Sequence, residues 1–210
     1  MEKCVIFCAA GFDGLLAPLG EDDFVIAADG GLTHTQALGI SPDVILGDFD
    51  SLGYVPQDSR AFPVEKDDTD MMLAIRLGLE RGCREFWLYG AMDGPRLDHT
   101  IANFQSLNFL TEYGAWGYLI GKDYIATCLR DGKISFSPSA EGILSVFCQG
   151  ADARGVYLTG LQYPLEDAVL TAHFPLGVSN HFLGREAAVE VRQGRLLCMW
   201  DRANGLCVRK

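Results

Sequence analysis

The first 130 residues alternate short apolar runs with segments of helical periodicity, and this alternation constrains the fold more than any other feature. Residues 5–9, 24–28 and 44–46 are apolar runs of strand length. Residues 69–82 and 99–113 carry apolar side chains three or four positions apart, which is typical of amphipathic helices. Strands that alternate with helices predict an α/β domain, in which helices flank a mainly parallel sheet.

The pattern changes near Asp131. Helical periodicity disappears, and turn residues separate short β-rich runs at 134–136, 143–147, 155–159, 169–172, 187–191 and 196–200. This spacing predicts a small antiparallel sandwich or barrel. We therefore expect an α/β domain over residues 1–130 and an antiparallel β-sandwich domain over residues 131–210.

Composition excludes several classes of protein. The 210-residue chain has a formal net charge of −11, which disfavours nucleic acid as a partner and permits ATP only where a divalent metal ion lies between carboxylates and phosphates. No apolar run approaches the roughly 18 to 20 residues of a membrane helix. The N-terminus has no signal-peptide pattern, and the seven cysteines contain no CxxC pair. We expect a cytoplasmic protein with reduced thiols and no membrane partner.

Three acidic or glycine-rich segments follow predicted parallel strands directly. They are Asp29-Gly30-Gly31, the GDFDS loop at 47–51 and the loop at 90–98. Ligands bind at the carboxyl edge of an open α/β sheet, so this placement predicts one composite site.

The acidic residues of this site suggest a metal ion. Asp48 and Asp50 are two positions apart, so their carboxylates point the same way in an extended segment and would hold Mg²⁺. A polar turn that caps backbone donors is the alternative. Asp70 falls in the first turn of a predicted helix, where Thr69 or Asp68 is a candidate cap.

Two basic residues of the site suggest phosphate binding. Arg96 can bind phosphate oxygens in a forked geometry, and Lys66 can contact a phosphate or neutralise its acidic neighbours. Asp98 is expected to start the helix at His99 and to hold Arg96. No Walker A sequence occurs, so the chain is not a P-loop enzyme.

The motifs together resemble the bacterial thiamine pyrophosphokinases. The matching stretches, in chain order, are AADGG at 27–31, SPDVILGDFDSL at 41–52, EKDDTDMMLAI at 65–75, GPRLDHTIAN at 94–103, TGLQYPL at 159–165 and GVSN at 177–180. The resemblance implies an α/β catalytic domain, a C-terminal β-sandwich domain and a homodimer whose active sites draw on both subunits. It also implies the conversion of thiamine and ATP into thiamine diphosphate and AMP.

The resemblance also implies roles for individual residues. Asp48, Asp50 and Asp70 would hold Mg²⁺ and act in catalysis. The nucleotide would contact Asp29, Lys66, Thr69, Arg96, Asp98 and Asn103. Ser179 and Asn180 would bind thiamine, with one subunit's β domain meeting the other subunit's catalytic domain. Phe182 and Trp200 are expected to pack in the core or an interface, with stacking on thiamine as the alternative.

One departure from the family pattern affects the nucleotide loop. Pro95 stands where a second glycine is more usual, and it has no amide to donate to a phosphate. Three rival functions use the same residues. They are pyrophosphoryl transfer to a pterin-like alcohol, a metal-dependent phosphohydrolase with Asp48 as nucleophile, and a non-enzymatic thiamine-binding regulator.

Overall fold

The computed structural model describes residues 3–49, 53–57, 59–61 and 68–210, and the chain divides into two units, Met1–Lys122 and Asp123–Lys210. The boundary that the sequence predicts at residue 130 stays a prediction. Among the described residues, no helix combines the length and the hydrophobicity that crossing a bilayer requires.

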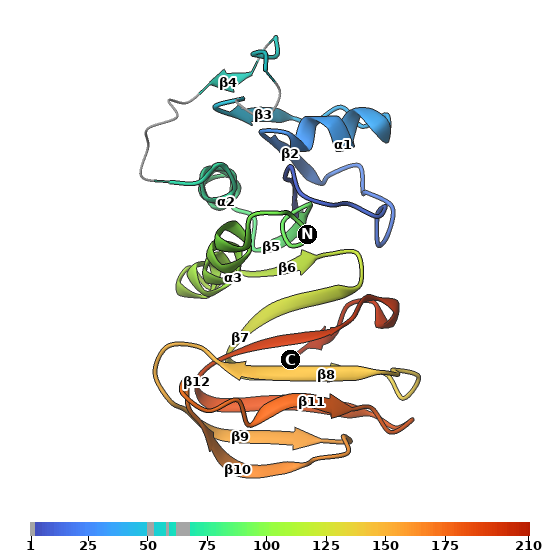
Figure 1. Cartoon of the computed structure of the whole chain (residues 1–210), viewed down its shortest axis with the longest axis vertical. Helices are drawn as coiled ribbons and strands as arrows, with labels where there is room; N and C mark the ends of the chain where they lie inside the picture. The colour runs from blue at the N-terminus through green and yellow to red at the C-terminus, as the bar shows by residue number, and fades with distance from the viewer. Residues whose placement is uncertain (1–2, 50–52, 58, 62–67) are drawn as a thin grey trace. The chain divides into compact units, whose positions relative to one another are not determined.

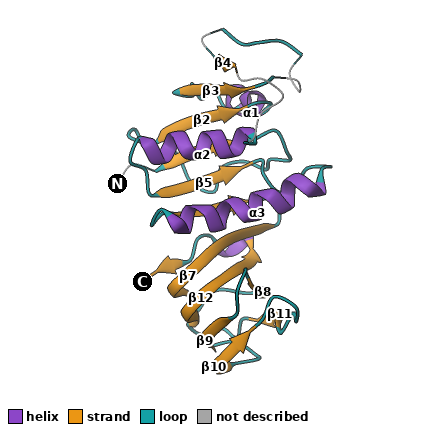
Figure 2. Cartoon of the chain, turned by 90° about the vertical axis from the view of Figure 1, so that its left-hand side faces the viewer, coloured by secondary structure: helices purple, strands orange, loops and turns teal. Residues whose placement is uncertain are grey.

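The first unit is a parallel sheet with helices on both faces, as the sequence predicts (Figures 1 and 2). Its strand order is β6-β5-β1-β2-β3-β4, and every paired neighbour is parallel. The helices α2 and α3 lie on one face, and α1 lies on the other. The elements are β1 (Cys4–Phe7), β2 (Phe24–Ala28), α1 (Gly31–Ala37), β3 (Val44–Gly47), β4 (Arg60–Ala61), α2 (Asp70–Glu80), β5 (Glu85–Tyr89), α3 (Leu97–Glu112) and β6 (Trp116–Ile120).

The centre of this sheet is apolar because its strands are covered on both sides. All residues of β1 and β2 are buried, which fits a parallel strand between two helical layers. Phe7 of β1 stacks on Tyr89 of β5 with 5.4 Å between ring centroids. This packing fixes the carboxyl ends of the two strands next to each other.

The second unit is antiparallel throughout its paired strands, as the sequence predicts. Its long strand β12 pairs with β7 along one edge and with β9 and then β8 along the other. The elements are β7 (Tyr124–Phe136), β8 (Ile143–Cys148), β9 (Ala153–Thr159), β10 (Leu165–Leu170), β11 (Gly177–His181), β12 (Ala187–Asp201), the 3₁₀ turn η1 (Arg202–Asn204) and β13 (Val208–Arg209).

Two strands of this unit are longer than the sequence pattern predicts. The predicted turn at Gln193-Gly194 is an irregularity inside β12, and it lies opposite Asp131 of β7. Asp131 and Gly194 both have positive φ, 44° and 111°, and the Gly194 N–H donates to the Asp131 carboxylate over 2.8 Å. Paired bulges let both strands bend without ending, so turn residues here mark a bend.

Three aromatic residues of the second unit, Phe136, Phe182 and Trp200, lie in its core. Trp200 is fully buried, and its ring centroid is 5.2 Å from that of Phe136. Phe182 packs against Phe136 from another side. The expected core positions of Phe182 and Trp200 are therefore confirmed.

Candidate active site

The strand order of the first unit has a topological switch point at β1. β1 lies between β2 and β5, so the chain extends the sheet in one direction through β2, β3 and β4 and in the other through β5 and β6. Loops leave such a point in opposite directions, which opens a ligand site outside the carboxyl ends of the strands. The three segments that the sequence singles out follow β2, β3 and β5 at this edge.

The glycine-rich loop after β5 contacts the segment that follows β1. The Cys8 N–H donates to the Tyr89 carbonyl over 2.9 Å, and the Ala10 N–H donates to the Gly90 carbonyl over 2.8 Å. A Cβ added to Gly94 would lie 3.0 Å from the Ala10 Cβ. The two loops therefore pack together directly above the sheet edge.

Helix α3 braces the same loop from its other side. Thr100 donates its hydroxyl to the Met92 carbonyl over 3.0 Å, and Asn103 donates its amide to the Ala91 carbonyl over 2.6 Å. Asn103 is buried, so its amide holds the loop in place. That Asn103 also contacts the nucleotide stays a prediction.

Arg96 and Asp98 form a forked ion pair at the start of α3. The Arg96 Nε and Nη2 atoms donate to the two Asp98 carboxylate oxygens over 3.0 and 2.6 Å. The hydrogen bond from Arg96 lowers the pKa of Asp98 from 3.8 to about 2. The helix begins at Leu97, so the sequence-based start at His99 is wrong. Asp98 occupies the first turn, where its negative charge interacts favourably with the positive end of the helix dipole.

The acidic loop after β3 begins next to Asp29. The Asp29 N–H donates to the Leu46 carbonyl over 2.8 Å, and a Cβ on Gly47 would lie 3.0 Å from the Asp29 Cα. Asp29 and Phe49 have positive φ values of 49° and 60°. Such strained backbone is common where a side chain has a functional position. Phe49 is buried, and the preceding Asp48 is only half-buried.

Asp70 brings a further carboxylate to this edge. The pKa of the Cys8 thiol is raised to about 12, chiefly by loss of solvation and in addition by the charges of Asp70 and Asp29. Two acids from different elements therefore act on one atom at the end of β1. Thr69 caps α2, because its hydroxyl accepts the Met72 N–H over 3.2 Å.

The donors at this edge are chemically suited to Mg²⁺. Asp29, Asp48 and Asp70 offer hard carboxylate oxygens, which are the protein ligands that Mg²⁺ prefers. Asp50 and Lys66, predicted for the metal and the nucleotide, lie outside the described residues. Within the described residues alone, no three acidic, histidine or cysteine side chains form a complete metal centre.

In the second unit, the two predicted thiamine contacts differ in exposure. Ser179 is exposed and has a positive φ of 57°. Asn180 is 3% exposed, and its carboxamide accepts the Tyr163 N–H over 2.8 Å and donates to the Tyr163 carbonyl over 2.7 Å. Tyr163 itself is 60% exposed. The sequence motifs at 159–165 and 177–180 are therefore joined by hydrogen bonds, and Tyr163 is a functional candidate that sequence reasoning missed.

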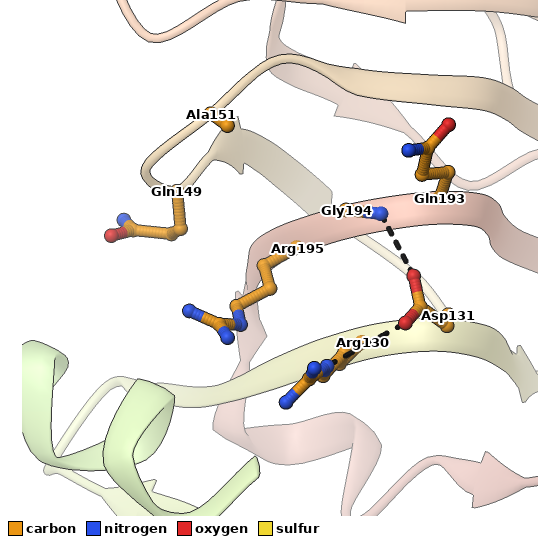
Figure 3. A pocket seen from close by; sticks show the side chains of 7 residues that line it. All are labelled: Arg130, Asp131, Gln149, Ala151, Gln193, Gly194 and Arg195. Atoms are coloured by element: carbon orange, nitrogen blue, oxygen red, sulfur yellow. Dashed lines mark hydrogen bonds and ion pairs between the residues drawn. The ribbon is translucent and has the colours of Figure 1, made fainter. Parts of the chain in front are cut away.

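The second unit also has an open pocket of about 240 Å³ between β7, β12 and the end of β8 (Figure 3). Arg130 and Arg195 line it with Gln149 and Gln193, and Arg130 pairs with Asp131 at 3.5 Å. None of the predicted site residues lines this pocket, so it is separate from the predicted site.

Comparison with known proteins defines the class of the molecule. A family model for the catalytic domain of thiamin pyrophosphokinase matches residues 18–113, and a model for its vitamin B1 binding domain matches residues 133–196. The first match lies in the parallel α/β unit and the second in the antiparallel β unit, so the chain belongs to a class of enzymes with a catalytic domain and a vitamin-binding domain. The chain belongs to the thiamin pyrophosphokinase family.

Individual relatives agree with this membership. Thiamine pyrophosphokinase of Bacillus subtilis strain 168 is 26% identical over 93% of this chain and 97% of its own length. The crystal structure of the Bacillus subtilis protein is similar with a TM-score of 0.81, at 23% identity over 94% of this chain and 98% of that chain. The Geobacillus thermodenitrificans structure gives 0.78, at 23% identity over 99% and 100%. This chain is accordingly an enzyme of that family, and the rival functions are not favoured.

Proposed function

We propose that this enzyme transfers the pyrophosphoryl group of ATP to the hydroxyl of thiamine, giving thiamine diphosphate and AMP. The observation that carries the proposal is that Asp29, Asp48 and the glycine-rich loop follow strands at one edge of the first unit's sheet. At the same edge, the charges of Asp70 and Asp29 both act on Cys8. The match of the second unit to a vitamin B1 binding domain supports thiamine over a pterin-like alcohol.

In this proposal Asp48, Asp50 and Asp70 hold Mg²⁺, which neutralises charge on the ATP phosphates when it is bound. Asp29 would lie at the nucleotide-phosphate end of the site. The backbone of the glycine-rich loop and Arg96 bind the nucleotide, with Asp98 orienting the guanidinium. Lys66, Thr69 and Asn103 complete the nucleotide side of the site.

The reaction is an in-line displacement at the β-phosphorus. The thiamine oxygen forms a bond to the β-phosphorus. The bond from that phosphorus to the oxygen it shares with the α-phosphorus breaks, and AMP leaves with the electron pair. The hydroxyl proton passes to a base at the site. Positioning and charge neutralisation account for most of the rate enhancement in such transfers.

The thiamine site of this proposal uses the β unit. Ser179 binds the aminopyrimidine ring, and Asn180 acts by holding Tyr163, whose exposed ring packs on the vitamin. We propose a homodimer in which this surface meets the catalytic unit of the partner subunit. Large exposed apolar side chains of the β unit would supply apolar area to this contact. They include Tyr163, Phe174, Leu176, Val178 and Leu183.

We also propose that the enzyme works in the cytoplasm. All seven cysteines are described, and none of them forms a disulfide bond. Reduced thiols in this number fit a reducing compartment.

The decisive experiment is incubation of the full chain with ATP, MgCl₂ and thiamine, followed by chromatography of the products. We expect AMP and thiamine diphosphate in equal amounts, with no reaction in EDTA. ADP as the nucleotide product would contradict the proposal, because it would indicate transfer of a single phosphoryl group. Phosphate release without thiamine would favour the phosphohydrolase instead.

A further inference from the structure

A lysine just beyond β6 lies at the same sheet edge as the glycine-rich loop. Lys122 follows the last residue of β6 by two positions, and its N–H donates to an Asp93 carboxylate oxygen over 2.7 Å. Its side chain then passes over Gly11, since a Cβ added to Gly11 would lie 2.9 Å from the Lys122 Cε. Three segments, after β1, β5 and β6, therefore meet at Lys122.

The surface over which Lys122 passes is held by several contacts. The Ala10 carbonyl contacts the His34 Nε2 atom at 2.9 Å, next to the bond between Ala10 and Gly90. Phe12 packs on Tyr89 with ring centroids 5.7 Å apart, and the Tyr89 hydroxyl accepts the Leu16 N–H over 3.1 Å. Gly11 is thus fixed between anchored neighbours, and the stem of Lys122 has a defined path.

No ion pair between the ammonium group of Lys122 and a carboxylate is found among the described residues, whereas Arg96 and Arg76 are both paired. Arg96 is engaged by Asp98, and Arg76 is engaged by Asp68 at 2.9 Å. The carboxylate of Asp93, which belongs to the glycine-rich loop after β5, accepts the Lys122 backbone N–H. Lys122 is exposed, so its charge is available to a ligand at this edge.

We propose that Lys122 is a phosphate-binding residue that contacts the polyphosphate chain of the nucleotide. This inference rests on the proposed function, in which ATP binds at the carboxyl edge of the first unit's sheet. An ammonium group forms strong charge-assisted hydrogen bonds with phosphate oxygens. In a chain with a net charge of −11, a cation at this edge reduces the repulsion that ATP meets on approach.

The test compares the K122M and K122R variants with the unmodified full chain. Calorimetric titration with ATP and MgCl₂, without thiamine, measures nucleotide affinity directly. We expect K122M to bind ATP about tenfold more weakly, K122R to bind within about threefold of the unmodified chain, and AMP affinity to change less than ATP affinity. Raising the NaCl concentration should weaken ATP binding more in the unmodified chain than in K122M.

A matched control is K133M, because Lys133 belongs to the second unit and pairs with Glu190 at 3.6 Å. It should leave ATP affinity unchanged. ATP affinity in K122M equal to that of the unmodified chain, or an equal loss in K122M and K122R, would overturn the inference.

The product assay separates this inference from the proposed function. If the unmodified chain makes no thiamine diphosphate, and K122M binds ATP more weakly than the unmodified chain, the proposed function fails and the role of Lys122 stands. If thiamine diphosphate forms and K122M binds ATP normally, only the role of Lys122 fails. A chain that binds no ATP at all would overturn both.

Discussion

Asn180 holds the backbone of Tyr163 from both sides, accepting its N–H over 2.8 Å and donating to its carbonyl over 2.7 Å. The same amide oxygen accepts the His181 N–H over 3.0 Å. A side-chain amide that mimics a strand partner fixes the direction in which the Tyr163 ring leaves the chain. The GVSN motif therefore positions the TGLQYPL motif, and the two act as one structural element.

Replacing Asn180 with alanine should lower both stability and thiamine affinity. N180A leaves the Tyr163 backbone groups without their partners, which costs about 1–3 kcal/mol of unfolding free energy. We expect the KM for thiamine to rise by on the order of tenfold while the KM for ATP stays unchanged. Urea unfolding and steady-state kinetics measure the two effects.

The matched control for Asn180 is Asn204. Its amide accepts the Glu141 N–H over 2.9 Å and donates to the Glu141 carbonyl over 2.8 Å, in an exposed turn. N204A should cost less stability and leave both KM values unchanged. An equal rise in the thiamine KM in the two variants would show that general loosening of the unit is responsible.

The sequence predicts the fold class because apolar periodicity depends on local spacing. The helix at residues 69–82 is observed as Asp70–Glu80, with Thr69 as its cap. From sequence alone, Gly194 predicts a turn between two strands, because glycine favours turns as well as bulges. Only the pairing of β7 with β12 shows that the strands continue.

The sequence predicts which segments lie at the sheet edge, but it does not predict the hydrogen-bond partners of the site residues, whose roles stay predictions. Strand order brings Asp29, Asp48 and the glycine-rich loop to one edge, as their places after strands predict. The partners of Asn103 and Asn180 lie 12 and 17 residues away in the sequence, and folding alone selects them. Lys122 carries no motif, so its place over Gly11 emerges only from the packing of three loops.

The second glycine of the AADGG motif should be indispensable for packing. Gly31 starts α1, and a Cβ there would lie 1.9 Å from the Phe7 carbonyl oxygen in the central strand. G31A must therefore displace backbone, which we expect to cost about 3 kcal/mol or more. G20A is the control, because its Cβ would meet nothing closer than 3.5 Å. Denaturant unfolding that gives equal stability for both variants would contradict this account.

The Arg96–Asp98 pair should govern how Asp98 titrates. The folded pKa of about 2 is below the ordinary 3.8, so the pair stabilises the fold above about pH 4, and this contribution is lost as pH falls through about 2. In R96M the Asp98 pKa should return toward 3.8, measured by carbon NMR of the carboxyl group. R76M, which removes the partner of Asp68, should leave that titration unchanged. An Asp98 pKa near 3.8 in the unmodified chain would show that the pair does not persist in solution.

Neutralising Asp48 or Asp70 should lower the activity of the enzyme without lowering its stability. Carboxylates that converge for a metal ion repel one another without it, so D48N and D70N should be at least as stable as the unmodified chain in EDTA. Turnover should fall on the order of 100-fold or more, because the charge that Mg²⁺ contributes depends on these ligands. Added MgCl₂ should raise the melting temperature of the unmodified chain more than that of either variant.

The control for these two variants is D152N, which removes an acid paired with Arg154 in the second unit and should change neither turnover nor stability. Near-normal turnover in both D48N and D70N would exclude the metal site.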